Sequence, residues 1–384
     1  MRRQDWELLL FSFVTAAYWA ATYFYVQILP SYILRLGGSQ ATVGNVSGAY
    51  GLTQAILRIP TGWWSDRLGR RMPLIIGGFA AAVLANLLFV LAAAPGTLLF
   101  ARAMAGVSST TWAIMTVYIA GRFPEDRLDA TMGFLYAVSN VAQLAASALG
   151  AHMAESWGWR APFFASLIAG AVGLALLPLL GREQRQATSG KTWGDLGCVA
   201  RRPLLLFVSL LGILVQYGYW ALAGFGPIVA ERLGASEGAL GNLSLFYMGP
   251  AILTSLAAGR LQTTLGRKRT LAAGFALMTL GLLALPSAGS LASLHLMLAL
   301  SGAGRGVVFP MLMSLSVWAV PPDRKGTAMG IFSALYAVGM FLGPGISGVY
   351  ADRYSLAGAF LLAGSLLAGG GLAAFLILPR WTKD

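Results

Sequence analysis

Three arginines lie inside long apolar stretches of this 384-residue chain. They are Arg58, Arg102 and Arg305. A guanidinium surrounded by hydrocarbon costs several kcal/mol unless it faces a partner or a wet cavity, so we expect Arg102 and Arg305 to point inward. Arg102 could instead cap buried backbone carbonyls. Arg58, two residues before Pro60, could belong to the charged loop that follows it.

The carboxylates are distributed in the opposite way. All 14 Asp and Glu residues fall near the ends of the apolar stretches or between them. Membrane proteins that move protons or cations usually hold a desolvated carboxylate within the bilayer. The three arginines have no such carboxylate in the same stretches. This predicts a core of positive potential, which favours a neutral or anionic molecule over a cationic one.

Residues for catalysis or metal binding are scarce. The chain has one cysteine, Cys198, and two histidines, His152 and His295, which are far apart in the sequence. One cysteine excludes an internal disulfide framework, and the histidines lack companion ligands for a metal ion. We therefore expect no enzyme activity, no metal and no cofactor.

The composition predicts an all-α integral membrane protein. Hydrophobic residues make up 57% of the chain and charged residues 11%, whereas a soluble domain has about 25% charged residues. A helix that crosses a membrane needs about 20 mainly apolar residues. Twelve such stretches lie at about 8–29, 41–63, 73–94, 97–120, 131–153, 160–180, 204–229, 240–259, 270–288, 292–319, 327–350 and 357–379.

The basic residues predict the orientation in the membrane. The chain carries 27 Lys and Arg and a formal net charge of +13. They cluster in short loops rather than along one helix face, which argues against a nucleic-acid partner. Twenty lie on the side of both termini and four on the other side, so we expect a multi-pass protein of the cytoplasmic (inner) membrane with cytoplasmic termini. Asp5 and Glu7 interrupt the basic start, so we expect no cleaved signal peptide.

The two halves of the sequence repeat at a constant offset of 197 residues. Equivalent helices must then run in the same direction, which predicts two parallel six-helix repeats. We expect an N-terminal bundle over 1–180, a polar cytoplasmic linker over 181–203 and a C-terminal bundle over 204–384. Matched pairs include Pro30 with Pro227, Gly37 with Gly234, Gly44 with Gly241, Tyr50 with Tyr247, and Arg70 with Arg267.

A charged loop follows the second stretch. Its spacing, G-x-x-x-D-R-x-G-R-R, is formed by Gly62, Asp66, Arg67, Gly69, Arg70 and Arg71. Gly62 would allow a neighbouring helix to approach closely, and Gly69 would supply the turn. This loop resembles the signature motif of the major facilitator superfamily, and the resemblance covers the whole chain. A degenerate second copy, 259–268, has Thr263 in place of the acid.

The resemblance implies roles for several residues. Asp66 and Arg70 would latch the cytoplasmic side of the two halves. Arg102-x-x-x-Gly106 is similar to the second motif of the family. The antiporter signature of the fifth helix is missing, which weakens the interpretation as a drug/proton antiporter.

In this family helices one, four, seven and ten line a central cavity. Trp19, Tyr23 and Gln27 recur every four residues and share one face of helix one. Aromatic residues can alternatively form belts at the membrane interface. The candidate substrate-binding residues are Trp19, Tyr23, Gln27, Arg102, Trp112, Asn140, Gln143, Gln216, Tyr219, Trp220 and Arg305, and helix ten also carries Trp318.

Several functions remain open at this level. The first is a monomeric secondary active transporter, similar to bacterial efflux members, that exports an amphipathic neutral or anionic small molecule by alternating access. The others are an uptake symporter or facilitator for organic anions, a transporter of lysolipid or glycolipid, and a non-transporting sensor. Membrane lipid is an expected partner, and a coupling proton is left open.

Overall fold

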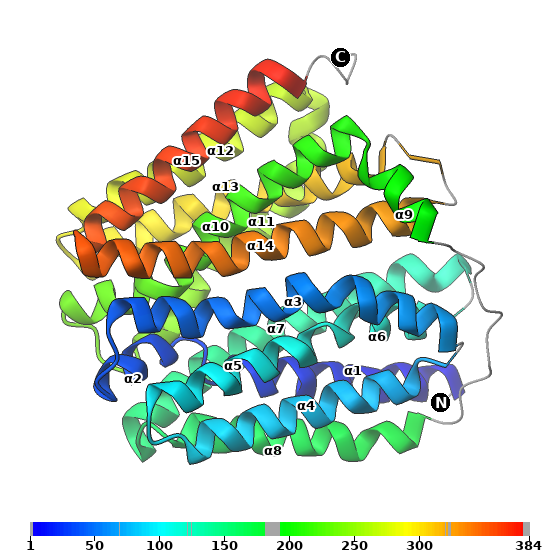
Figure 1. The fold of residues 1–384 in the computed structure, drawn as a ribbon, viewed down its shortest axis with the longest axis horizontal. Coiled ribbons are helices and arrows are strands. Elements are labelled where there is room, and N and C mark those ends of the chain that lie inside the picture. The colour runs from blue at the N-terminus through cyan, green and yellow to red at the C-terminus, as the bar shows by residue number, and fades with distance from the viewer. Residues whose placement is uncertain are drawn as a thin grey trace.

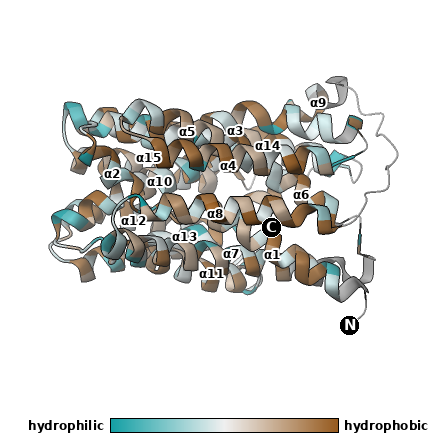
Figure 2. Cartoon of the chain, turned by 90° about the horizontal axis from the view of Figure 1, so that it is seen from below, coloured by the Kyte–Doolittle hydropathy of each residue, from teal (hydrophilic) through white to brown (hydrophobic). Residues whose placement is uncertain are grey.

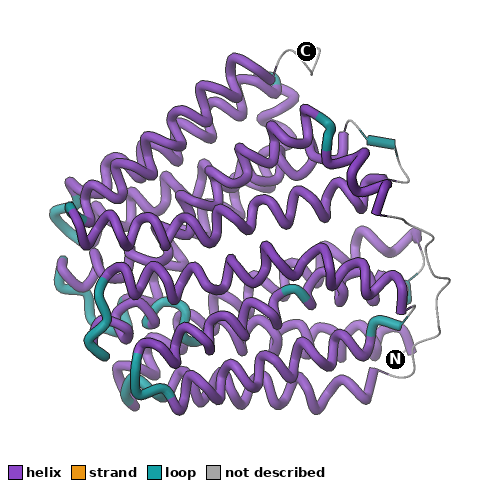
Figure 3. The backbone as a smooth tube through the Cα atoms, viewed as in Figure 1, coloured by secondary structure: helices purple, strands orange, loops and turns teal. Residues whose placement is uncertain are grey.

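The computed structural model describes residues 3–68, 70–120, 122–123, 125–180, 193–318, 320–321 and 324–378, and every regular element in these ranges is a helix (Figures 1 and 3). The predicted all-α membrane fold is confirmed. The first half contains α1 (Arg3–Tyr23), α2 (Leu29–Arg35), α3 (Gln40–Leu68), α4 (Met72–Leu91), α5 (Pro95–Ser109), α6 (Thr111–Ala120), α7 (Glu125–Trp157), α8 (Ala161–Leu176) and η1 (Leu177–Leu180). The remainder contains α9 (Trp193–Ala200), α10 (Pro203–Arg232), α11 (Leu240–Leu265), α12 (Arg267–Ala284), η2 (Leu285–Ser287), α13 (Leu291–Trp318), α14 (Lys325–Arg353) and α15 (Leu356–Ile377).

Nine of the described helices are long and apolar enough to cross a membrane. The other three predicted spans correspond to α1 with α2, to α3, and to α5 with α6. Two of these were wrongly predicted as continuous helices, 8–29 and 97–120. Pro30 stands in the first turn of α2, where proline favours a helix start. At the second break the hydroxyls of Ser109 and Thr110 donate to the carbonyls of Gly106 and Val107, which competes with the helical ladder.

The backbone confirms the parallel repeat. Gly37 and Gly234, 197 residues apart, both have a positive φ, 82° and 86°, directly after equivalent helices. Such a φ is unfavourable for residues with a side chain. The repeat is not exact, because α10 runs unbroken through the region equivalent to α1 and α2.

Both described ends of the chain lie at the same end of the bundle, which we call the terminal face, and the opposite end is the far face (Figure 1). Polar residues gather mostly in the loops at these two ends (Figure 2). Figure 1 shows the helices of the two halves close together at the far face, and α3 and α14 diverging toward the terminal face.

Helices α3 and α14 form the longest contact between the two halves. A Cβ atom on Gly44 would overlap the carbonyl oxygen of Pro344, and one on Gly348 would overlap that of Gln40. The equivalent contact joins α11 to α7, where a Cβ on Gly241 would lie 2.8 Å from the Cα of Ala148. Small residues therefore let the backbones touch at related places in both halves.

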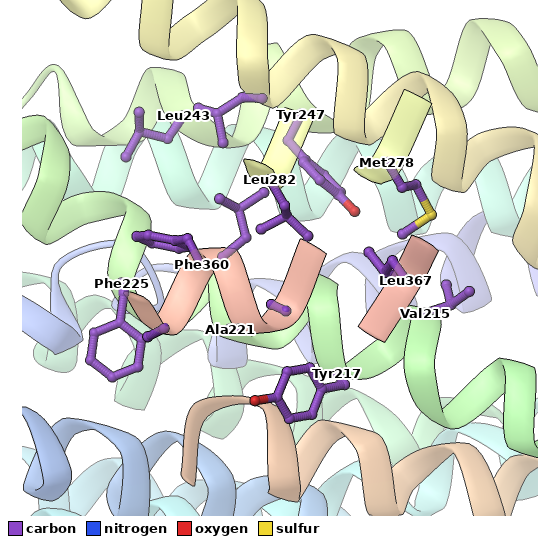
Figure 4. Packing of buried hydrophobic residues seen from close by; sticks show 14 of the residues in the cluster. Val215, Tyr217, Ala221, Phe225, Leu243, Tyr247, Met278, Leu282, Phe360 and Leu367 are labelled. Carbon is purple, nitrogen blue, oxygen red and sulfur yellow. The ribbon is translucent and has the colours of Figure 1, made fainter. Parts of the chain in front are cut away.

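The second half has a continuous apolar core. Side chains from α10, α11, α12 and α15 interdigitate there, among them Phe225, Tyr247, Leu282 and Phe360 (Figure 4). This packing holds α10 and α11 rigidly beside the interface between the halves.

Part of the predicted linker is helical. Residues 181–192 lie outside the described residues, but Trp193–Ala200 form α9. Cys198 on α9 is exposed and accepts a hydrogen bond from Arg324 at 3.4 Å. The division of the chain at 181–203 stays a prediction.

Candidate functional site

A pocket lies between the two halves. Its volume is about 40 Å³, far below the ~300–1,000 Å³ typical of ligand pockets. A sizeable molecule could enter only if the halves or the side chains move. The lining residues are Tyr23, Val26, Gln27, Tyr219, Trp220, Leu222, Ala223, Gly226, Pro227, Leu243, Ser244, Tyr247, Met248 and Leu298.

Four of the predicted binding residues meet in this pocket: Tyr23, Gln27, Tyr219 and Trp220. Gln27 lies in the break between α1 and α2, where its side chain is free to reach across the interface. Its Nε2 donates to the hydroxyl of Ser244 on α11. The irregular backbone of this segment thus supplies a polar contact between the halves.

Arg102 is buried beside the pocket rather than in its wall. Its side chain is 2% exposed and packs on the ring of Tyr50 at 4.3 Å, with Tyr25 and Trp220 farther away at 5.7 and 5.9 Å. Nη1 donates to the hydroxyl of Tyr25 at 3.3 Å. Its Nε has no hydrogen-bond partner among the described residues. The charge is therefore offset by aromatic rings, with no carboxylate among its described contacts.

Arg305 occupies a related environment in the second half. Its guanidinium lies 4.3 Å from the ring of Tyr219 and 5.1 Å from that of Phe309. Tyr219 in turn contacts Tyr247 with ring centroids 5.0 Å apart. Arg305 is only partly buried, and its Nε also has no partner among the described residues. It is the more accessible of the two charges.

Trp19 and Trp112 belong to an aromatic cluster on the first half. Their rings lie 5.3 Å apart, and Trp19 also contacts Tyr23 at 5.8 Å. Tyr136 on α7 completes the cluster at 6.0 Å from Trp112 and is half exposed. The cluster therefore adjoins the pocket through Tyr23 without lining it.

Three predicted amides lie apart from the pocket lining. Gln143 and Gln216 are buried, and Asn140 is partly exposed. The Oε1 atom of Gln216 has no partner among the described residues. We expected Trp318 on the cavity side of its helix. It is half exposed and is the last residue of α13, at the terminal face.

The predicted latch is only partly described. Gly69 and the side chain of Asp66 lie outside the described residues, while Arg67 packs on Trp63 of its own helix at 4.2 Å. The close helix contact expected at Gly62 was wrong, because a Cβ there would meet no described atom within 4 Å. Arg70, exposed, and Arg71, partly buried, lie between α3 and α4.

Arg58 provides an unexpected contact between the halves. Its Nη1 donates to the carbonyl of Ser333 on α14 at 2.9 Å, and its guanidinium lies 4.8 Å from the ring of Tyr336. Nη2 binds Gln54 one turn earlier. The sequence alone did not indicate this contact.

The roles of two tyrosines near the core arginines were not predicted from the sequence. Tyr50 and Tyr247 match at the 197-residue offset and contact Arg102 and Tyr219 respectively. Their repetition at the 197-residue offset was the available signal, although the two tyrosines have different neighbours.

Two parallel helical repeats that enclose a pocket at their interface are the architecture of a membrane transporter. Residues 11–221 and 208–383 match the family model described as Major Facilitator Superfamily, and the chain belongs to that superfamily. The inner membrane transport protein YajR of Escherichia coli (strain K12) is 26% identical over 374 residues, covering 89% of this chain and 76% of YajR.

Solved structures share the fold at low identity. A bacterial homologue of the human lysosomal transporter Spinster, in an inward-facing and occupied conformation, has a TM-score of 0.83 at 16% identity and covers 100% of this chain and 98% of that one. The human organic anion transporter MFSD10 has a TM-score of 0.70 at 16% identity, with coverage of 97% and 100%.

Proposed function

We propose that this transporter exports an amphipathic organic molecule, preferably an anion, across the cytoplasmic membrane by alternating access. One observation carries the proposal. Arg102 and Arg305 lie in the core on aromatic rings, and the described helices hold Asp and Glu only within five residues of their ends. A core with this charge attracts an anion and repels a cationic drug.

Within this proposal the two arginines have different roles. Arg305 is only partly buried and lies 4.3 Å from the ring of Tyr219 in the pocket wall, and it would bind the anionic group of the cargo directly, through charge-assisted hydrogen bonds. Arg102 is buried and would contribute its potential while Tyr25 and Tyr50 hold it in place. The rings of Tyr23, Tyr219 and Trp220 would bind the apolar part of the cargo.

The export direction is supported by the sign of the charge. An anion that leaves a cell with a negative interior is driven outward by about 2.3 kcal/mol per 100 mV. Such transport needs no proton, which agrees with the position of the carboxylates at helix ends. In this proposal the terminal face is cytoplasmic because it carries most Lys and Arg.

Another protein of this fold is named for transporting organic anions. The solved structure of MFSD10, named as an organic anion transporter, has the same fold. At 16% identity this similarity supports only the statement that the fold can carry organic anions. The cargo of this chain is therefore inferred from Arg102 and Arg305.

Efflux from proteoliposomes would test the function. Vesicles loaded with anilinonaphthalene sulfonate, or with an uncharged analogue, would be given an inside-negative potassium diffusion potential. We expect the potential to accelerate efflux of the anion, and Arg305→Gln to abolish the acceleration. Uptake driven by a pH gradient would favour the symporter alternative, and scrambling of labelled lipid would favour the lipid alternative.

Membrane orientation can be tested with the natural cysteine. Cys198 is exposed on α9, near the terminal face. A membrane-impermeant maleimide should label it in inverted vesicles and leave it unlabelled in intact spheroplasts. The reverse pattern would contradict the proposed orientation.

A further inference from the structure

A basic recess opens on the terminal face of the second half, away from the pocket between the halves. It lies where α11 passes into α12 and includes Arg267, Lys268, Arg269 and the ring of Trp318 from the end of α13. Its volume is about 710 Å³. The recess is therefore much roomier than the central pocket.

Aromatic rings hold two of these cations in place. The guanidinium of Arg267 lies 4.9 Å from the ring of Trp318, and Nζ of Lys268 lies 3.8 Å from the ring of Phe375. The rings orient the charges without neutralising them. In addition, Nε of Arg267 is buried and has no hydrogen-bond partner among the described residues.

The recess also lacks a described counter-charge. The equivalent loop of the first half carries Asp66 where this loop has Thr263, and the hydroxyl of Thr263 donates to the carbonyl of Arg260 in its own helix. No ion pair with a described carboxylate involves Arg267, Lys268 or Arg269. The loss of one acid thus leaves a concentrated positive charge.

The apolar rim indicates where the partner comes from. Trp318 and Leu265 are about half exposed beside the cations, at the depth where helices end and tryptophan prefers the membrane interface. A soluble anion would gain nothing from these two side chains, whereas a phospholipid would bury its glycerol and upper acyl segments on them.

We propose that this recess binds the phosphate group of an anionic phospholipid from the leaflet at the terminal face. Arg267 and Lys268 contact the phosphate, Arg269 adds charge at the rim, and Trp318 and Leu265 contact the lipid below the headgroup. The site is separate from the cargo pocket and does not depend on the proposed export function.

Native mass spectrometry of the purified full chain, with phosphatidylglycerol or phosphatidylcholine added, would test the site. We compare the double variant Arg267→Gln/Lys268→Gln with the control Arg201→Gln/Arg202→Gln, which removes the same charge from exposed residues between α9 and α10. At ~1 kcal/mol per cation, the first variant should bind phosphatidylglycerol about 30-fold more weakly. The control should bind like the parent protein.

A second variant keeps every cation. Thr263→Asp restores the acid of the first-half motif at an exposed position, and it should also weaken binding of phosphatidylglycerol while leaving phosphatidylcholine unaffected. Equal losses in the Arg201→Gln/Arg202→Gln control would overturn the proposal, because general surface charge would then explain the binding. Displacement of the lipid by inorganic phosphate at comparable concentration would overturn it in favour of a soluble-anion site.

Discussion

Asp352, one residue from the end of α14, accepts hydrogen bonds from the backbone nitrogens of Gln40 at 2.9 Å and of Ala41 at 2.8 Å, in the first turn of α3. The carboxylate of one half thus caps a helix of the other half at the far face. The first turn of α3 has no acid of its own, so this contact supplies the negative charge that a helix N-terminus favours.

Asp352→Asn should destabilise the closed far face. The amide loses the charge that interacts with the helix dipole, at a cost of about 1–2 kcal/mol. We expect a roughly tenfold larger population of molecules open at the far face. Spin labels at Ala94 and Gly289, in exposed far-face loops of the two halves, would report it as a longer distance in a Cys198→Ser background.

Glu237→Gln should have a much smaller effect. Arg35 and Glu237 form an ion pair across the halves at 3.0 Å, but Arg35 is 56% exposed and also packs on Trp159 at 4.2 Å. Exposed ion pairs contribute about 0–1 kcal/mol. The same label pair should show less than about a fivefold change in the population open at the far face, and added salt should remove this change. A change as large as that of Asp352→Asn would contradict this assignment.

Gly44→Ala and Gly241→Ala should both separate the halves. Each added methyl group would meet backbone atoms of the opposing half, which costs about 1–3 kcal/mol when the backbone must shift. Thermal unfolding and the far-face distance would measure the effect. Gly249→Ala on α11 and Gly62→Ala on α3 are the controls, since a Cβ there meets no described atom within 4 Å.

Arg305→Gln should weaken binding of an amphipathic anion by ~1–3 kcal/mol. The charge that we assign to the anionic group is removed, while Tyr219 and Phe309 remain for the apolar part. Fluorescence titration with anilinonaphthalene sulfonate would measure the affinity. Arg305→Lys should retain part of it, and an uncharged analogue should bind both proteins equally. Unaltered affinity for the anion would make Arg305 structural.

Asp66→Asn should slow transport and shift the protein toward the form open at the terminal face. The reason is the motif position of Asp66, which implies a latch on that side. Arg67→Gln is the control variant. Arg67 packs on Trp63 of its own helix, so we expect this substitution to leave transport unchanged. Unchanged transport and unchanged labelling at the terminal face in Asp66→Asn would reject the latch.

The sequence was sufficient for the architecture because hydrophobic length and repetition are local signals. The offset that pairs Gly37 with Gly234 predicted a repeat that the backbone confirms. The breaks between α1 and α2 and between α5 and α6 were not predicted. Hydropathy does not register a proline that starts a helix, or a hydroxyl that donates to a carbonyl of its own helix.

The site was harder to predict because it depends on contacts between distant helices. Helix periodicity and the resemblance pointed to Tyr23, Gln27, Tyr219 and Trp220, which line one pocket; that they bind the cargo stays a prediction. Arg102 faces inward as predicted, yet its neighbours Tyr25 and Tyr50 come from other segments, and no single-helix pattern specifies that packing.

The turn segment that holds Gln27 between α1 and α2 has no counterpart in the second half, where α10 continues past Trp220 as one helix. In the proposed transport cycle, the cargo would therefore contact an irregular segment on one side and a continuous helix on the other. We expect the irregular segment to adjust to cargo of different shapes more readily than the continuous helix does, so tolerance toward varied cargo would reside in the first half and discrimination in the second.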